Sequence, residues 1–191
     1  FKISKKSTIF VSLLCGLFSS IVPNKVIYCS EKSIKFHEKK HFYVKNKTAL
    51  INNGYSDKLF FNSNLLRRNF RAKYKIKKTD IVLGYAGRYA KQKNIYSLLR
   101  AFALVKKKYS NINLFMVGKN MNEKNKELNS IVEENKISNK IFFLDEQKNL
   151  VQFYNGIDLL LLVSHSESFP NVVAESMLCS TPVLSSDAGC A

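Results

Sequence analysis

A chain of 191 residues with 46% hydrophobic and 24% charged residues has the composition of a globular protein, which excludes disorder and a membrane-embedded bundle as default interpretations. Its formal net charge of +17 is concentrated in residues 1–80, which hold 18 of the 31 basic residues and only 4 of the 14 acidic ones. This clustering favours a nucleic acid or an anionic membrane surface as a partner, although a Lys-rich composition with many Asn and Ile equally fits AT-biased coding.

The first 20 residues have two interpretations. Residues 2–20 combine a basic start, an apolar run over 9–18 and small residues after it, which is the outline of a signal peptide. The apolar run is shorter than the roughly 20 residues that a membrane-spanning helix needs. A turn, a short strand over 26–29 and a helix start at 30–31 follow. We therefore favour a buried helix that leads into a buried strand.

The next segment, residues 45–78, is polar and irregular. Residues 52–57 have the composition of a turn, and the basic stretch 67–78 predicts a short helix. We interpret this segment as a linker region.

From Asp80 onward, apolar runs alternate regularly with amphipathic stretches. The predicted strands are 81–87, 112–118, 140–144, 158–164 and 182–186, and the predicted helices are 94–109, 122–134, 149–155 and 171–178. Such alternation predicts parallel strands joined by right-handed crossovers, and the run LLLLV is typical of a sheet covered on both faces. The fold class is therefore α/β, with a doubly wound parallel sheet whose ligands bind beyond the carboxyl ends of the strands.

The four cysteines are Cys15, Cys29, Cys179 and Cys190. They form no CxxC pair and show no Cys/His spacing that suits zinc. We expect reduced thiols in a cytoplasm, without a redox role.

The first predicted strand is followed by the loop GYAGRYAKQKN, residues 84–94. Gly87 stands at the strand end, where a glycine lets a ligand approach the backbone. Arg88 and Lys93 follow, and two cations around a tight loop can neutralise a diphosphate. Taken alone, such a pair also fits a solvated surface.

The fourth predicted strand is followed by SHSESFPNVVAES, residues 164–176. Pro170 and Asn171 mark a helix N-terminus, whose free N–H groups form an anion site. Glu167 ends the loop and Glu175 lies on the helix, where a carboxylate can accept hydrogen bonds from the vicinal hydroxyls of a sugar or ribose. The alternative is a pair of exposed glutamates beside a helix start.

The stretch E-S-F-P-N-V-V-A-E has two glutamates with seven residues between them, and it resembles the EX7E signature of the retaining GT-B glycosyltransferases of family 4, or group 1. The loop G-R-Y-A-K-Q-K-N resembles that family's GR(x)4K loop. Other segments resemble parts of the family that occur in the same order: the strand F-M-V-G, the strand D-L-L-L-L-V-S before the EX7E stretch, and the segment after it up to D-A-G. The match covers nearly the whole chain.

The resemblance implies a GT-B fold and transfer of a sugar from a nucleotide sugar with retention at the anomeric carbon. Arg88 and Lys93 would hold the diphosphate, Glu167 would contact the transferred sugar, and Glu175 would take the ribose hydroxyls. The implied catalytic residues are thus Glu167, Arg88 and Lys93. The implied donor-binding residues are Gly87, Arg88, Lys93, Glu167, Phe169, Pro170, Asn171, Val172 and Glu175. No metal or cofactor is expected, and a UDP- or GDP-linked sugar would be the co-substrate.

The resemblance also implies a domain organisation. Residues 1–57 would be the C-terminal remnant of the N-terminal (acceptor) domain, 58–79 an interdomain linker, and 80–191 a Rossmann-like nucleotide-sugar-binding domain that is incomplete at its C-terminus. The acceptor site would belong mostly to a part of the N-terminal domain outside this sequence, so this fragment alone could be inactive.

The partners implied are the donor, a lipid-linked or saccharide acceptor, and an anionic membrane in peripheral contact. The pathway would be bacterial surface polysaccharide or lipopolysaccharide synthesis in the cytoplasm, at the inner face of the cell membrane. Two alternatives stay open: a Lys-rich nucleic-acid-binding module and a secreted domain led by a signal peptide. The sequence contains no helix-turn-helix, zinc or RNP-type motif, so no nucleic acid is expected.

Overall fold

The computed structural model describes residues 6–188, which divide by their contacts into two compact units. The first unit contains residues 6–54 and the loop 166–170. The second contains residues 55–165 and 171–188. No helix among residues 6–188 is both long and apolar enough to cross a membrane.

The first unit is a small α/β assembly. Its elements are α1 (Lys6–Phe18), β1 (Val26–Tyr28), α2 (Glu31–Lys40), the 3₁₀ turn η1 (Lys45–Lys47) and β2 (Thr48–Leu50). The two strands pair in parallel. The Ser30 side chain accepts a hydrogen bond from the Ser33 amide at 3.2 Å and caps α2. The predicted strand at 26–29 and helix start at 30–31 are confirmed, but the strand is not buried as expected, since Ile27 is 63% exposed. The strand β2 was missed.

The helix α1 corrects the interpretation of residues 2–20 as a buried helix. Within Lys6–Phe18, Gly16 is the one buried residue, and Phe10 is 62% exposed. Gly16 is needed for packing, because a Cβ atom there would overlap the backbone carbonyl of His41. The helix therefore contacts the rest of its unit along a narrow line. Residues 2–5 lie outside the described residues.

The second unit begins with α3 and continues in regular alternation. Its elements are α3 (Asn64–Lys73), β3 (Ile81–Ala86), η2 (Lys91–Lys93), α4 (Ile95–Lys108), β4 (Ile112–Val117), α5 (Lys126–Glu134), η3 (Ser138–Lys140), β5 (Ile141–Phe143), α6 (Val151–Gly156), β6 (Leu159–Leu162), α7 (Asn171–Leu178) and β7 (Val183–Ser185). The five strands and four helices predicted after Asp80 are confirmed, with ends that differ by a few residues.

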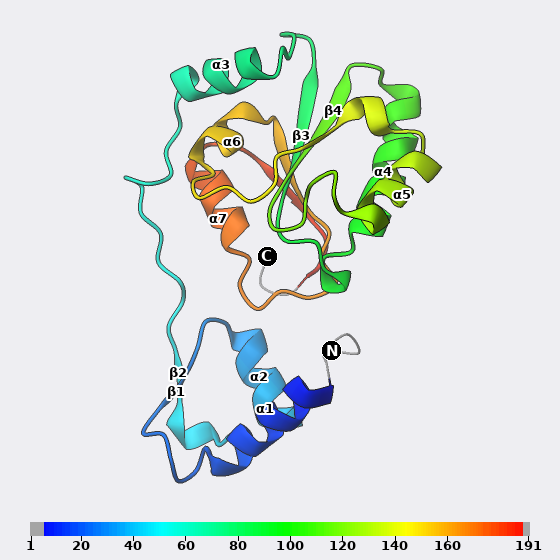
Figure 1. The fold of residues 1–191 in the computed structure, drawn as a ribbon. Helices are drawn as coiled ribbons and strands as arrows, with labels where there is room; N and C mark the ends of the chain where they lie inside the picture. The colour runs from blue at the N-terminus through cyan, green and yellow to red at the C-terminus, as the bar shows by residue number, and fades with distance from the viewer. Residues whose placement is uncertain (1–5, 189–191) are drawn as a thin grey trace. The chain divides into compact units, whose positions relative to one another are not determined.

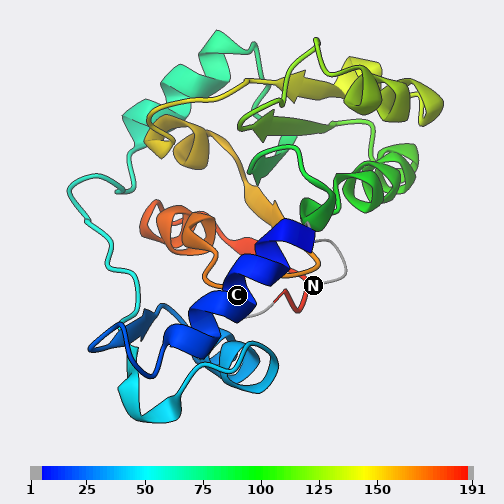
Figure 2. The same cartoon turned by 60° about the horizontal axis from the view of Figure 1, so that its bottom comes forward.

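The five strands form one parallel sheet in the order β5-β4-β3-β6-β7. Figure 1 shows α4 and α5 on one face and α6 and α7 on the other, and the turned view in Figure 2 keeps this division. All six residues of β4 are buried, since successive side chains enter opposite layers. Leu114 and Met116 join the core under α4 and α5, whereas Phe115 and Val117 join the core under α6. The predicted doubly wound α/β fold is confirmed.

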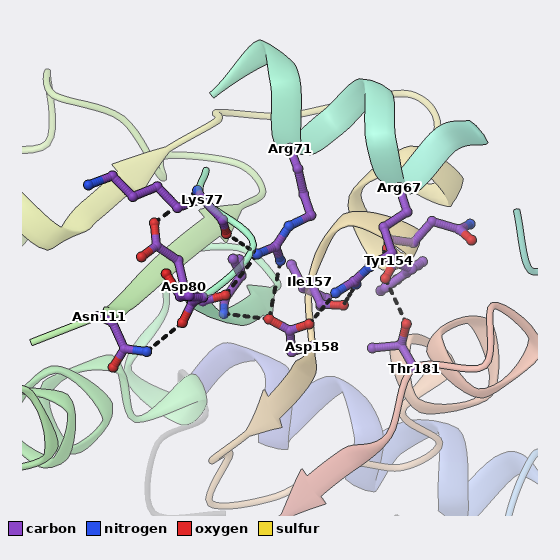
Figure 3. Close-up of polar contacts among 12 residues, drawn as sticks. Arg67, Arg71, Lys77, Asp80, Asn111, Tyr154, Ile157, Asp158 and Thr181 are labelled. Atoms are coloured by element: carbon purple, nitrogen blue, oxygen red, sulfur yellow. Dashed lines mark hydrogen bonds and ion pairs between the residues drawn. The ribbon is translucent and has the colours of Figure 1, made fainter. Parts of the chain in front are cut away.

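The helix α3 is fixed to the second unit through Asp158. Figure 3 shows Arg67 and Arg71 reaching from α3 to this carboxylate. The Arg71 bond is 3.3 Å long, and the amide of Val82 donates to the same oxygen, Oδ2, at 2.7 Å. Phe70 of α3 is 3% exposed within the core. The segment 58–79, assigned from the sequence to a linker, therefore contributes a packed helix to the second unit.

Three of the four cysteines, Cys15, Cys29 and Cys179, are free thiols. Cys190 lies outside the described residues.

Candidate nucleotide-sugar site

The loop after β3 carries Gly87, Arg88 and Lys93, and its first residues are held against the end of β4. The Gly87 amide donates to the carbonyl oxygen of Val117 at 2.9 Å. A Cβ atom on Gly87 would lie 2.7 Å from the hydroxyl of Tyr85, which is fully buried. The strand end therefore accommodates only glycine without rearrangement, and the reason is the packing of Tyr85. The approach of a ligand to Gly87 stays a prediction.

The next glycine, Gly118, makes a closer approach that the sequence analysis did not single out. Its φ of +139° is rarely adopted by residues with a side chain, and a Cβ atom there would overlap the carbonyl oxygen of Gly87. The Tyr89 amide adds a hydrogen bond of 2.9 Å to the Lys119 carbonyl. Backbone contacts thus fix the loop on both sides of Arg88. The position of Gly118 at the end of the predicted strand 112–118 was the available signal.

The two cations of this loop differ in exposure. Arg88 is exposed, and Lys93 is half-buried at the end of η2. The following residue, Asn94, adopts a left-handed conformation with φ 53° and ψ 40° and turns the chain into α4. Both cationic side chains therefore come from a short turn at the carboxyl end of the central strand.

The loops after β3 and β6 are joined by a backbone hydrogen bond. The amide of His165 donates to the carbonyl oxygen of Gln92 at 2.8 Å. Next to it, Ser164 is 2% exposed, and its hydroxyl has no hydrogen-bond partner among residues 6–188. A buried polar atom is normally paired, so this strand end offers an unsatisfied group.

The helix α7 carries three of the predicted donor-binding residues. Asn171 is exposed, is the first residue of the helix, and accepts a hydrogen bond from the Tyr55 hydroxyl through Oδ1 at 2.8 Å. Val172 packs against the core under α6. Glu175, one turn further along, is half-buried.

Glu175 has a buried partner that sequence reasoning missed. The Tyr154 hydroxyl donates a hydrogen bond to Oε2 of Glu175 at 2.7 Å, and Tyr154 is fully buried. Burial, together with the nearby Glu175 charge, raises the pKa of Tyr154 well above its ordinary value. The phenol is therefore a permanent donor to the carboxylate. Tyr154 and Glu175 are 21 residues apart in the sequence. No local sequence pattern therefore distinguished Tyr154 from an ordinary aromatic residue of the core.

The loop 166–170, which carries the remaining predicted residues, belongs by its contacts to the first unit. Glu167 and Phe169 are half-buried, and Pro170 is buried. Six of the nine predicted donor-binding residues therefore lie in the second unit. They are Gly87, Arg88, Lys93, Asn171, Val172 and Glu175.

Comparisons with known proteins point to one family. The family described as "Glycosyl transferases group 1" matches residues 67–191. An uncharacterized glycosyltransferase of Methanocaldococcus jannaschii is 30% identical over 184 residues, which are 90% of this chain and 44% of that protein. The capsular polysaccharide biosynthesis glycosyltransferase CapM of Staphylococcus aureus is 28% identical over 154 residues, or 74% of this chain and 38% of CapM.

The fold is that of solved GT-B glycosyltransferases. The crystal structure of Alr3699/HepE of Anabaena, in complex with UDP-glucose, superposes with a TM-score of 0.85 at 22% identity, over 96% of this chain and 50% of that one. The chain spans less than half the length of the two curated relatives it matches. On the family match over residues 67–191, the chain belongs to the group 1 glycosyltransferases.

Proposed function

We propose that this protein transfers a sugar from a nucleotide-sugar donor to an acceptor, with retention at the anomeric carbon. The observation that carries the proposal is the hydrogen bond between His165 and Gln92. It joins the loop of Arg88 and Lys93 to the strand end that leads towards α7 and Glu175. Cations and a carboxylate at one edge of a parallel sheet suit a ligand that contains a diphosphate and a polyol.

Each residue has a proposed role. Arg88 and Lys93 bind the diphosphate and stabilise the departing nucleoside diphosphate as its negative charge develops. Glu167 contacts the transferred sugar, assisted by backbone groups of residues 169–172. Glu175 accepts hydrogen bonds from the ribose hydroxyls. Gly87 leaves room for the ligand beside the backbone.

The pathway proposed is synthesis of a bacterial surface polysaccharide or lipopolysaccharide on a lipid-linked or saccharide acceptor. The similarity to CapM supports it, and the UDP-glucose complex of HepE supports a UDP-linked donor. The proposed location is the cytoplasm, at the inner face of the cell membrane. Basic residues within 1–80 would contact anionic lipid there.

The alternative of a nucleic-acid-binding module gains little from the described residues. Arg67 and Arg71 belong to the basic stretch 67–78, but both direct their guanidinium groups to Asp158 and to backbone carbonyls. Their charge is therefore used within the fold and is not free to contact phosphates.

Calorimetric titration of the full chain with UDP, GDP and UDP-sugars tests the proposal. Arg88→Ala and Glu175→Ala should each weaken binding roughly tenfold or more, as expected for the loss of one hydrogen bond to a charged group. Arg100→Ala, on the exposed side of α4, is the matched control and should bind like the wild type. A folded chain that binds none of these ligands would overturn the proposal.

Retention has its own test. Proton NMR can follow slow hydrolysis of whichever UDP-sugar binds and identify the anomer that is released first. An α-linked donor should release the α anomer, whereas initial release of the β anomer would contradict retention.

A further inference from the structure

We propose that Tyr154 is a positioning residue that fixes the Glu175 carboxylate for recognition of the donor's ribose hydroxyls. The inference rests on the function proposed above and adds a residue from the buried side of the site. Its basis is the hydrogen bond of 2.7 Å from the Tyr154 hydroxyl to Oε2 of Glu175.

The geometry leaves the carboxylate available to a ligand. An ionised carboxylate has about four acceptor positions on its two oxygens. The phenol occupies one of them from the buried side, and Glu175 itself is half-buried. The remaining positions suit the two neighbouring O–H donors of a ribose ring. Because the raised pKa keeps Tyr154 protonated, the phenol does not compete for those donors at physiological pH.

Tyr154 is itself held rigidly. Its ring packs edge-on against Phe60 and Phe153, with ring centroids 6.1 Å and 5.6 Å away. Its carbonyl oxygen accepts a hydrogen bond of 2.7 Å from the Thr181 hydroxyl, as Figure 3 shows. A rigid donor selects one rotamer of the partner side chain, which would otherwise sample several.

The contacts close into a ring that contains Glu175. Ser176, the next residue of α7, donates through its hydroxyl to the Thr181 carbonyl at 3.0 Å. Thr181 donates to Tyr154, and Tyr154 donates to Glu175. The Glu175 carboxylate and the hydroxyl of the adjacent Ser176 are thus both anchored to the linked residues Tyr154 and Thr181. An arrangement of this kind pre-organises a binding group before the ligand arrives.

A purely structural role makes a different prediction. If Glu175 only satisfies a buried hydroxyl, removing that hydroxyl changes stability and leaves ligand discrimination intact. If Tyr154 positions Glu175, its removal reduces the preference for a ribose that carries both hydroxyls. The ratio of two affinities measured on one protein separates these roles, because a general loss of stability affects both ligands alike.

The experiment measures binding of UDP and GDP, and of their 2′-deoxy counterparts, to the full chain by calorimetry. The wild type should prefer the ribonucleotide roughly tenfold, the value of one hydrogen bond to a charged group. Glu175→Gln and Tyr154→Phe should each reduce this preference to less than about threefold. Tyr109→Phe, an exposed tyrosine at the end of α4, is the control and should keep the full ratio.

The outcomes separate the two proposals. If the wild type discriminates and Glu175→Gln does not, a full ratio in Tyr154→Phe overturns the positioning role alone. If the wild type binds none of the four nucleotides, the proposed function falls, and this inference falls with it. Should Tyr154→Phe not fold, Thr181→Val removes the hydroxyl that holds the Tyr154 carbonyl and should also reduce the ratio.

Discussion

The carbonyl oxygen of Gly87 lies against the α-carbon of Gly118, so that the ends of β3 and β4 touch backbone to backbone. This contact sets the start of the loop that carries Arg88. Because φ at Gly118 is +139°, both the space and the conformation at this position require glycine.

We predict that Gly118→Ala lowers the free energy of unfolding by about 2 kcal/mol or more, through the overlap with Gly87 and the strained φ. It should also weaken UDP binding, because Arg88 follows the displaced residue. Urea unfolding and calorimetry measure the two effects. Gly54→Ala is the control, since a Cβ atom there meets no other atom within 4 Å and its stability should stay within about 0.5 kcal/mol of the wild type. Equal stability of the two variants would contradict the prediction.

Asp158 should be a stabilising residue at the amino end of the sheet. Its carboxylate accepts from Arg67, Arg71 and the Val82 amide, and removing its charge leaves two arginines without their anionic partner. We expect Asp158→Asn to cost about 2 kcal/mol in urea unfolding, less than a fully buried pair because the Asp158 side chain is 30% exposed. Asp57→Asn, at an exposed position, should change stability by less than about 0.5 kcal/mol. A loss no larger than that of Asp57→Asn would show that α3 is held by its apolar contacts alone.

Ionisation of the Tyr28 phenol should lower the free energy of unfolding at alkaline pH. Its hydroxyl is buried without a hydrogen-bond partner among residues 6–188, and burial, followed by Tyr43 and Glu38, raises its pKa from 10.0 to about 12. The unfolded chain therefore ionises this phenol first, so its contribution to stability is complete below pH 10 and is lost as the pH rises towards 12.

We predict that Tyr28→Phe is as stable as the wild type at pH 8, or more stable, because the substitution removes an unsatisfied buried hydroxyl. Between pH 10 and 12 it should lose stability less steeply, by up to roughly 1.4 kcal/mol per pH unit. Urea unfolding over this pH range measures the difference, and parallel curves would rule out the effect.

His37 should titrate below its ordinary pKa of 6.5, because burial, with a smaller contribution from His41, disfavours its charged form. The Nδ1 atoms of the two rings lie 3.0 Å apart, an arrangement that requires one of them to accept. The stability that depends on neutral His37 is therefore present above pH 6.5 and is lost as the pH falls through the lowered value.

Proton NMR of the imidazole signals measures this midpoint. We expect His41→Gln to raise the midpoint of His37 towards 6.5, since it removes the neighbouring charge. If the titration midpoint of His37 is unchanged in His41→Gln, burial alone causes the lowered pKa of His37.

The sequence by itself determined the parallel α/β class and the alternation of strands and helices after Asp80. It also placed Gly87 at a strand end and Glu175 on a helix. These features depend on local periodicity and on glycine, whose effects act over a few residues. The strand β2 was not recognised because its three residues lie within the polar segment 45–78. Polar residues such as Arg67 look solvated until a distant carboxylate is placed beside them.

Only the tertiary structure decided which distant residues meet. The pairing of Tyr154 with Glu175, of Asp158 with α3, and of Gly118 with Gly87 joins segments 21 to 91 residues apart along the chain. Tertiary packing also left α1 exposed, although its sequence is apolar. Burial and hydrogen bonding depend on what the rest of the chain brings to a position, and no local pattern records that.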